Sequence, residues 1–152
     1  MSDAKDLKGK TGVKRLTNAF FYSKDGFAAA YQSEEAFRQE FWLLVVGSII
    51  AFVLPVTLLQ TVALIAVLLL LLIVEILNSA IEAAIDRIGT EIHPLSKRAK
   101  DMGSCAVLFA CFLAAIVWIA VVVDCFFLNW RACCFSVKTN LLKNTRSDVK
   151  NR

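Results

Sequence analysis

Four polar side chains recur at helical spacing inside an otherwise apolar segment. Glu75, Asn78, Glu82 and Asp86 lie at offsets of 0, 3, 7 and 11 residues, which places them on one face of an α-helix. A carboxylate inside a membrane helix costs roughly 3 kcal/mol on insertion scales and usually marks a functional site. Two carboxylates one or two turns apart can share a divalent cation, or one can act as a base. The alternative is a row of polar side chains that only holds helices together. Three acids and one amide on the same face make this alternative less favoured.

Cationic residues follow this acidic stripe along the chain. The segment 89–101 contains Lys97, Arg98, Lys100 and the single histidine, His93. Cations beside metal-binding carboxylates suit a polyphosphate, because they offset its charge while the metal bridges its oxygens. The alternative is a positively charged loop that only anchors the chain on the cytoplasmic side.

A second polar cluster precedes the first long apolar segment and comprises Glu34, Glu35, Arg38, Gln39 and Glu40. Glu34 and Arg38 are four residues apart, so they could form a helical ion pair. A glutamate of this cluster could instead complete a metal site from another helix.

Charge-free segments define the elements that must position these groups. Residues 41–74 include no Asp, Glu, Lys or Arg over 34 positions, and residues 102–123 include none over 22. A membrane span needs roughly 20 apolar residues, and backbone in lipid must form helices or closed barrels. Pro55, Thr57, Gln60 and Thr61 indicate a break in the longer segment. We therefore predict an all-α membrane protein with spans at about 41–58, 60–88 and 102–127.

An amphipathic helix is predicted before the first span, at about 14–33. Leu16, Phe20, Phe27 and Tyr31 recur at helical spacing, and charged residues lie between them. This pattern is typical of a helix at a membrane surface. An ordinary helix packed on its neighbours is a compatible alternative, and Gly26 is where either could be interrupted.

Composition and charge bound the remaining possibilities. The chain is 58% hydrophobic with a net charge of +4, which suits a membrane protein and gives no indication of nucleic-acid binding. The five cysteines lack the spacing of a zinc site or disulfide framework. Residues 1–128 are predicted to form one domain, and residues 129–152 a basic tail. Lysine and arginine positions place the N-terminus and the 89–101 loop in the cytoplasm, and three spans place the C-terminus outside despite its basic tail.

Longer motifs around the same residues resemble one known family. The stretches 74–82, 86–89 and 97–104 read VEILNSAIE, DRIG and KRAKDMGS, and residues 35–40 read EAFRQE. Together they are similar to the prokaryotic diacylglycerol kinase family, over about residues 11–127. The segments DRIG and KDMGS are closer to the diacylglycerol kinases of double-membraned bacteria than to their undecaprenol kinase relatives.

The resemblance implies a homotrimer of three-span subunits in the bacterial inner membrane, each with an N-terminal surface helix. Its activity would transfer the γ-phosphate of ATP, bound with Mg²⁺, to diacylglycerol. Glu75 would be the general base, and Glu34 and Glu82 would hold the metal. The residues matching the ATP site are Arg15, Tyr22, Glu34, Asn78, Glu82, Glu91, His93, Lys100 and Asp101. Those matching the lipid site are Ser23, Arg38, Gln39, Glu40, Glu75, Ser104 and Trp118.

Two other functions remain open at this point. An undecaprenol kinase would perform the same chemistry on a polyprenyl alcohol. A membrane scaffold or ion-coupled transporter subunit would use the acids without catalysis, although a transporter usually has more spans or internal repeats.

Overall fold

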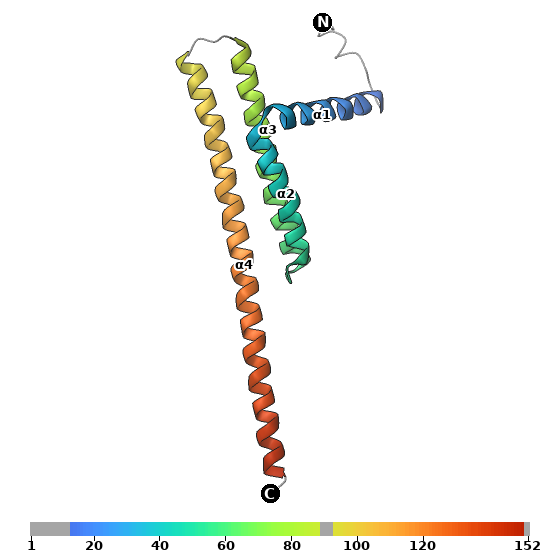
Figure 1. The fold of residues 1–152 in the computed structure, drawn as a ribbon, viewed down its shortest axis with the longest axis vertical. Coiled ribbons are helices and arrows are strands. Elements are labelled where there is room, and N and C mark those ends of the chain that lie inside the picture. The colour runs from blue at the N-terminus through green and yellow to red at the C-terminus, as the bar shows by residue number, and fades with distance from the viewer. Residues whose placement is uncertain (1–12, 89–92, 151–152) are drawn as a thin grey trace.

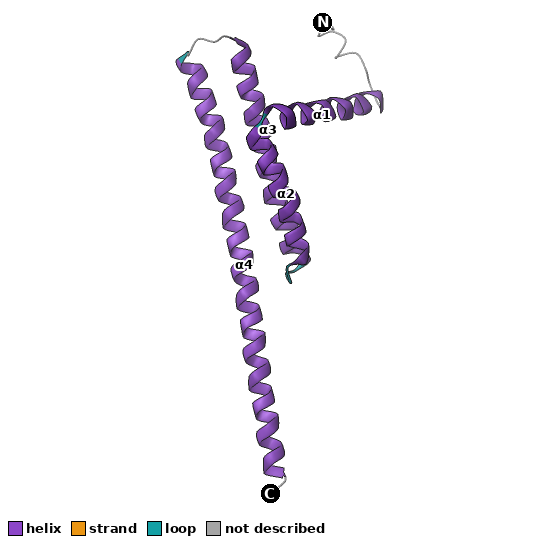
Figure 2. Cartoon of the chain, in the orientation of Figure 1, coloured by secondary structure: helices purple, strands orange, loops and turns teal. Residues whose placement is uncertain are grey.

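The computed structural model describes residues 13–88 and 93–150, with side chains described within residues 15–88 and 93–127. The described chain forms four helices: α1 (Val13–Ser33), α2 (Glu35–Val53), α3 (Leu58–Ile88) and α4 (Pro94–Lys150). Figure 2 shows helices joined by short connections, and the described residues contain no strand. The predicted all-α architecture is confirmed.

Helix α1 extends sideways from the other three helices, which run roughly alongside one another (Figure 1). A single extended residue, Glu34 with φ −108° and ψ 119°, separates α1 from α2 and produces the change of direction. The amide of Glu34 donates to the carbonyl of Ala30 at 2.9 Å, which closes the last turn of α1. Gly26 does not interrupt this helix. The sideways orientation fits a helix that lies along a membrane surface.

Three helices are long and apolar enough to cross a membrane: Glu35–Val53, Leu58–Ile88 and Pro94–Phe127. Helix α2 ends at Val53 and residues 54–57 form a turn, so the helix ends before residue 58, the predicted limit of the first span. Thr57 and Gln60 then cap α3: the Gln60 amide donates to Thr57 Oγ1 at 3.3 Å, and the Thr57 amide donates to Gln60 Oε1 at 2.9 Å.

The predicted loop at 89–101 was too long. Helix α4 begins at Pro94, because proline suits the first helical position, where its missing N–H would lack a partner anyway. The amide of Leu95 donates to His93 Nδ1 at 3.2 Å, which satisfies one free donor of this helix end. The helix that carries the third span therefore starts eight residues before the predicted 102 and continues to Lys150. Helix α4 continues through residue 129 without a break. The basic tail from that residue onward stays a prediction.

The helices pack through two small buried clusters. Ala30, Phe37 and Leu72 join α1, α2 and α3, while Ala51, Leu64 and Val121 join α2, α3 and α4 nearer the α2–α3 turn. Most other large apolar side chains are exposed, as expected for surfaces that face lipid or further subunits. The homotrimer remains a prediction.

Replacing Phe37 with alanine is expected to loosen the junction of α1 and α2. Phe37 is 1% exposed, and its ring meets the ring of Phe27 edge-on at 5.3 Å. Removing a buried phenylalanine side chain costs about 3 kcal/mol when the cavity cannot collapse. Thermal inactivation in detergent would measure the loss, with Phe37→Leu as the milder control. Equal stability of the alanine variant and the wild type would contradict this packing role.

Candidate active site

A polar pocket of about 300 Å³ lies among α2, α3 and α4, beside the start of α2. Glu34, at the junction of α1 and α2, contributes one carboxylate to its lining. Helix α3 contributes the successive turns of the acidic stripe, and α4 contributes Ser104. The lining residues are Glu34, Ala36, Glu75, Asn78, Ser79, Glu82, Ser104 and Val107. Five residues assigned by resemblance to catalysis, metal, nucleotide or lipid thus converge from three parts of the chain.

Glu75 is the most buried acid of this pocket, at 5% exposure. Glu34 and Glu82 lie close enough for their negative charges to act on it. Neither of the two ion pairs of the described residues involves Glu75. A carboxylate in these surroundings can accept a proton from a group that enters the pocket.

Asn78 connects the stripe to α4. Its side-chain amide Nδ2 donates to Glu82 Oε1 at 3.2 Å, one turn along the same helix. Its Oδ1 atom is buried and has no hydrogen-bond partner. A Cβ atom added to Gly103 would collide with that oxygen, so glycine allows the α4 backbone to approach Asn78 closely. A buried acceptor beside the pocket is suited to a donor from a bound molecule.

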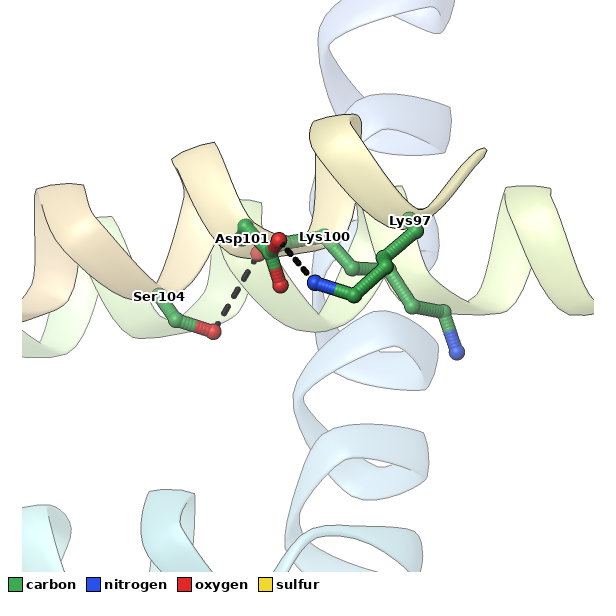
Figure 3. Close-up of polar contacts among 4 residues, drawn as sticks. All are labelled: Lys97, Lys100, Asp101 and Ser104. Atoms are coloured by element: carbon green, nitrogen blue, oxygen red, sulfur yellow. Dashed lines mark hydrogen bonds and ion pairs between the residues drawn. The ribbon is translucent and has the colours of Figure 1, made fainter. Parts of the chain in front are cut away.

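Two ion pairs lie beyond the pocket, near the ends of α3 and α4 that face the 89–92 connection. Lys100 Nζ lies 2.6 Å from Asp86 Oδ1 and so joins α4 to α3. Lys97 Nζ lies 2.6 Å from Asp101 Oδ2 within α4. Figure 3 shows the Lys97–Asp101 pair apart from the Lys100 ammonium, and the Ser104 hydroxyl donating to the Lys100 carbonyl at 3.2 Å. Lys100 and Asp101, both assigned to the nucleotide, therefore already have partners.

The polar cluster at the start of α2 is divided among several roles. Arg38 Nη1 donates to the carbonyls of Tyr31 and Gln32 at 3.1 and 3.3 Å, so it caps the C-terminus of α1. The alternative ion pair of Arg38 with Glu34 is not among the ion pairs of the described residues. Gln39 donates to Glu35 at 3.3 Å. Glu40 is half-buried, and its Oε2 atom has no hydrogen-bond partner.

Several residues assigned by resemblance do not line this pocket. Arg15, Tyr22 and Ser23 are exposed on α1. His93 is exposed at the start of α4, where it caps the helix. Glu91 lies outside the described residues. Within one chain, these assignments are not brought together with the acidic stripe.

Trp118 lines a different space, an apolar groove of about 370 Å³ among α2, α3 and α4. It lies fourteen residues beyond Ser104 on α4, or about 21 Å along the helix. Its indole N–H donates to the Leu64 carbonyl at 3.3 Å. Cys111, which also lines the groove, is near enough to Glu40 and Glu75 to experience their charge. The groove is lined almost entirely by apolar residues, and it shares no lining residue with the acidic pocket.

Ser79 was not assigned a role from the sequence, yet it is buried and lines the pocket. Its place beside the acidic stripe on the helical face was the available signal. Ala36 and Val107 also line the pocket, but their side chains carry no chemical group that could have indicated it.

The donor set of the pocket suits a metal ion that arrives with other ligands. The described residues contain no group of three His, Cys, Asp or Glu side chains placed to hold a metal ion. Glu34 and Glu82 nevertheless line the same pocket. Mg²⁺ commonly binds one or two carboxylates and takes its remaining ligands from water and substrate phosphates. Two carboxylates therefore fit a magnesium ion that is bound together with a polyphosphate.

Comparisons with known proteins agree on one family. A family model described as prokaryotic diacylglycerol kinase matches residues 21–122. A diacylglycerol kinase of Pseudomonas aeruginosa is 53% identical over 112 residues, covering 74% of this chain and 91% of the relative. One of Escherichia coli K12 is 52% identical over 108 residues, covering 71% and 88%. One of Helicobacter pylori J99 is 43% identical over 118 residues, covering 78% and 92%.

Proposed function

This chain belongs to the prokaryotic diacylglycerol kinase family, and we propose that it transfers the γ-phosphate of ATP to the free hydroxyl of diacylglycerol. The product would be phosphatidic acid. The observation that carries this proposal is the pocket in which buried Glu75 lies with Glu34, Asn78 and Glu82.

Phosphoryl transfer requires positioning and neutralisation of charge more than covalent catalysis. In our proposal, Glu75 accepts the proton of the lipid hydroxyl as its oxygen forms a bond to the γ-phosphorus. The bond from that phosphorus to the bridging oxygen breaks, and ADP leaves. The burial of Glu75 supports this role because it keeps the reacting carboxylate away from bulk water.

Glu34 and Glu82 are the residues that would hold Mg²⁺, which when bound offsets negative charge on the phosphate oxygens. Asn78 has an unpartnered oxygen at the same place, and we assign it to the nucleotide. Lys100 and Asp101 lie on α4 about one turn before Ser104, toward the start of the helix. We propose that the phosphates and the rest of the nucleotide bind there.

The lipid would approach from the apolar groove. Ser104 lines the acidic pocket, Glu40 is close enough to Glu75 to experience its charge, and Trp118 lines the apolar groove. The apolar lining of the groove suits an acyl chain, and Cys111 in that lining is near enough to Glu75 to experience its charge, so we propose that the hydroxyl end of the lipid reaches the base. Arg38 would then orient this entrance through its contacts with the C-terminal carbonyls of α1, and we assign Gln39 to the same entrance.

We propose a homotrimer in the bacterial inner membrane, with the N-terminus and the 89–101 segment in the cytoplasm and the C-terminus outside. In such an assembly, Arg15, Tyr22 and Ser23 on α1 would contribute to a site completed by a neighbouring subunit. Their exposure in the single chain supports this arrangement.

Purified protein in mixed micelles is expected to transfer label from γ-labelled ATP to diacylglycerol when magnesium is present, and to lose this activity when magnesium is chelated. Undecaprenol, offered in parallel, tests the related kinase activity. Label only in the polyprenyl product would retain the mechanism and change the substrate. No label in either lipid, from protein shown to be folded, would favour a non-enzymatic scaffold or transporter subunit.

A further inference from the structure

We propose that Asp86 competes with the nucleotide for Lys100, so that Asp86 weakens ATP binding at the entrance of the pocket. This inference rests on the proposed function, because it assigns Lys100 to the phosphates of ATP. The proposed function assigns no role to Asp86. Here we infer that Asp86 is a positioning residue that acts through Lys100.

The contact is direct and joins α3 to α4, two of the helices that form the pocket. Asp86 lies one turn beyond Glu82 on α3, and its Oδ1 atom accepts a hydrogen bond from Lys100 Nζ at 2.6 Å. The Lys100 ammonium is also close enough to Glu82 to be attracted by its charge. Lys100 therefore lies between a carboxylate of the pocket and a carboxylate outside it.

The exposure of this ion pair makes an exchange of partners feasible. The Asp86 side chain is 65% exposed, and that of Lys100 is 35% exposed. Water screens such pairs, so they contribute little to stability and are readily exchanged for a better partner. A triphosphate offers several charged oxygens and forms stronger charge-assisted hydrogen bonds with an ammonium group. Entry of ATP would therefore transfer Lys100 from Asp86 to a phosphate.

The second ion pair provides a contrast. Lys97 and Asp101 are four residues apart on α4, so their contact requires no other helix. Figure 3 shows the Lys97 ammonium directed at Asp101, while the Lys100 ammonium points away from that pair. Of the two ion pairs of the described residues, only the Lys100–Asp86 pair joins α4 to α3.

Asp86→Asn keeps the shape of the side chain and removes its charge, so Lys100 becomes available to the nucleotide. The dissociation constant of a non-hydrolysable MgATP analogue is expected to fall by two- to five-fold, and the KM for MgATP should fall with it. The KM for diacylglycerol should stay constant, because this pair does not face the lipid groove. Asp86→Glu should retain wild-type affinity, and the effect of Asp86→Asn should shrink in high salt.

Asp25→Asn is the matched control, because it makes the same charge change on exposed α1. If that variant binds the analogue as tightly as Asp86→Asn does, general charge attraction explains the effect and the proposal fails. Unchanged or weaker binding by folded Asp86→Asn, in a wild-type background that binds the analogue, would overturn this inference alone. A wild-type protein that does not bind the analogue would overturn the proposed function as well.

Discussion

Glu75→Gln is expected to lower kcat for diacylglycerol phosphorylation by about 10²- to 10⁴-fold, the usual contribution of a general base. Glutamine has the same shape but cannot accept the proton of the lipid hydroxyl. Glu75 is 5% exposed within the pocket, so water cannot easily replace its carboxylate. The KM for MgATP should change little, because this residue is assigned to the lipid hydroxyl. Initial rates in mixed micelles at saturating ATP would measure the effect.

Glu35→Gln provides the matched control for that experiment. Glu35 is an exposed glutamate at the start of α2, outside the lining of the pocket. It should retain activity close to wild type, although its hydrogen bond with Gln39 is weakened. Full activity in folded Glu75→Gln protein would refute the base assignment while leaving the family membership intact. Equal losses in both variants would instead indicate a general effect of removing charge near the membrane surface.

The acidic stripe could be predicted because it depends only on local geometry. Spacing alone places Glu75, Asn78 and Glu82 on one helical face, and the structure brings all three to one pocket. Glu34 is different, because it lies at the junction of α1 and α2 and not on α3, the helix that carries the stripe. Its convergence with the stripe was predicted by the family resemblance and by the suggestion that a second helix could complete the site.

The ends of the helices were harder to predict from the distribution of charge. Residues 35–40 carry three charges, so the first span was expected to begin after them. Helix α2 nevertheless begins at Glu35, because backbone hydrogen bonding does not depend on whether the side chains face lipid or water. Pro94 similarly starts α4 within a segment whose cations indicated a loop. The composition therefore predicted three long apolar helices, but it predicted the ends of those helices poorly.

Contacts between helices could not be predicted from one sequence. The spacing of Glu34 and Arg38 suggested an ion pair, but Arg38 caps the carbonyls of α1 because that helix ends beside it. Trp118 was assigned to the lipid site, but the sequence did not indicate that it lines an apolar groove separate from the acidic pocket. The role of Gly103 required knowing which residue of α3 faces it.

Gly103→Ala is expected to reduce activity by about 10- to 100-fold, because it forces α4 away from α3, the helix that carries Asn78 and Glu82. The added Cβ would collide with Asn78 Oδ1, so either α4 moves outward or the Asn78 side chain leaves Glu82. Forcing extra atoms into a packed interface costs about 1–3 kcal/mol, and small displacements of catalytic groups lower rates strongly. Thermal inactivation and initial rates, measured on the same preparations, would report both effects.

Gly26→Ala is the control for this substitution, since no atom lies within 4 Å of the Cβ it would add. Alanine favours a helix over glycine by about 1 kcal/mol, so this variant should be as stable as the wild type or slightly more stable. The double variant Gly103→Ala, Asn78→Ala separates packing from chemistry: removing the Asn78 amide relieves the collision, so stability should return while activity should not. A Gly103→Ala protein with wild-type stability and rate would mean that α3 and α4 do not meet through Asn78, and the pocket would then need a different arrangement of these helices.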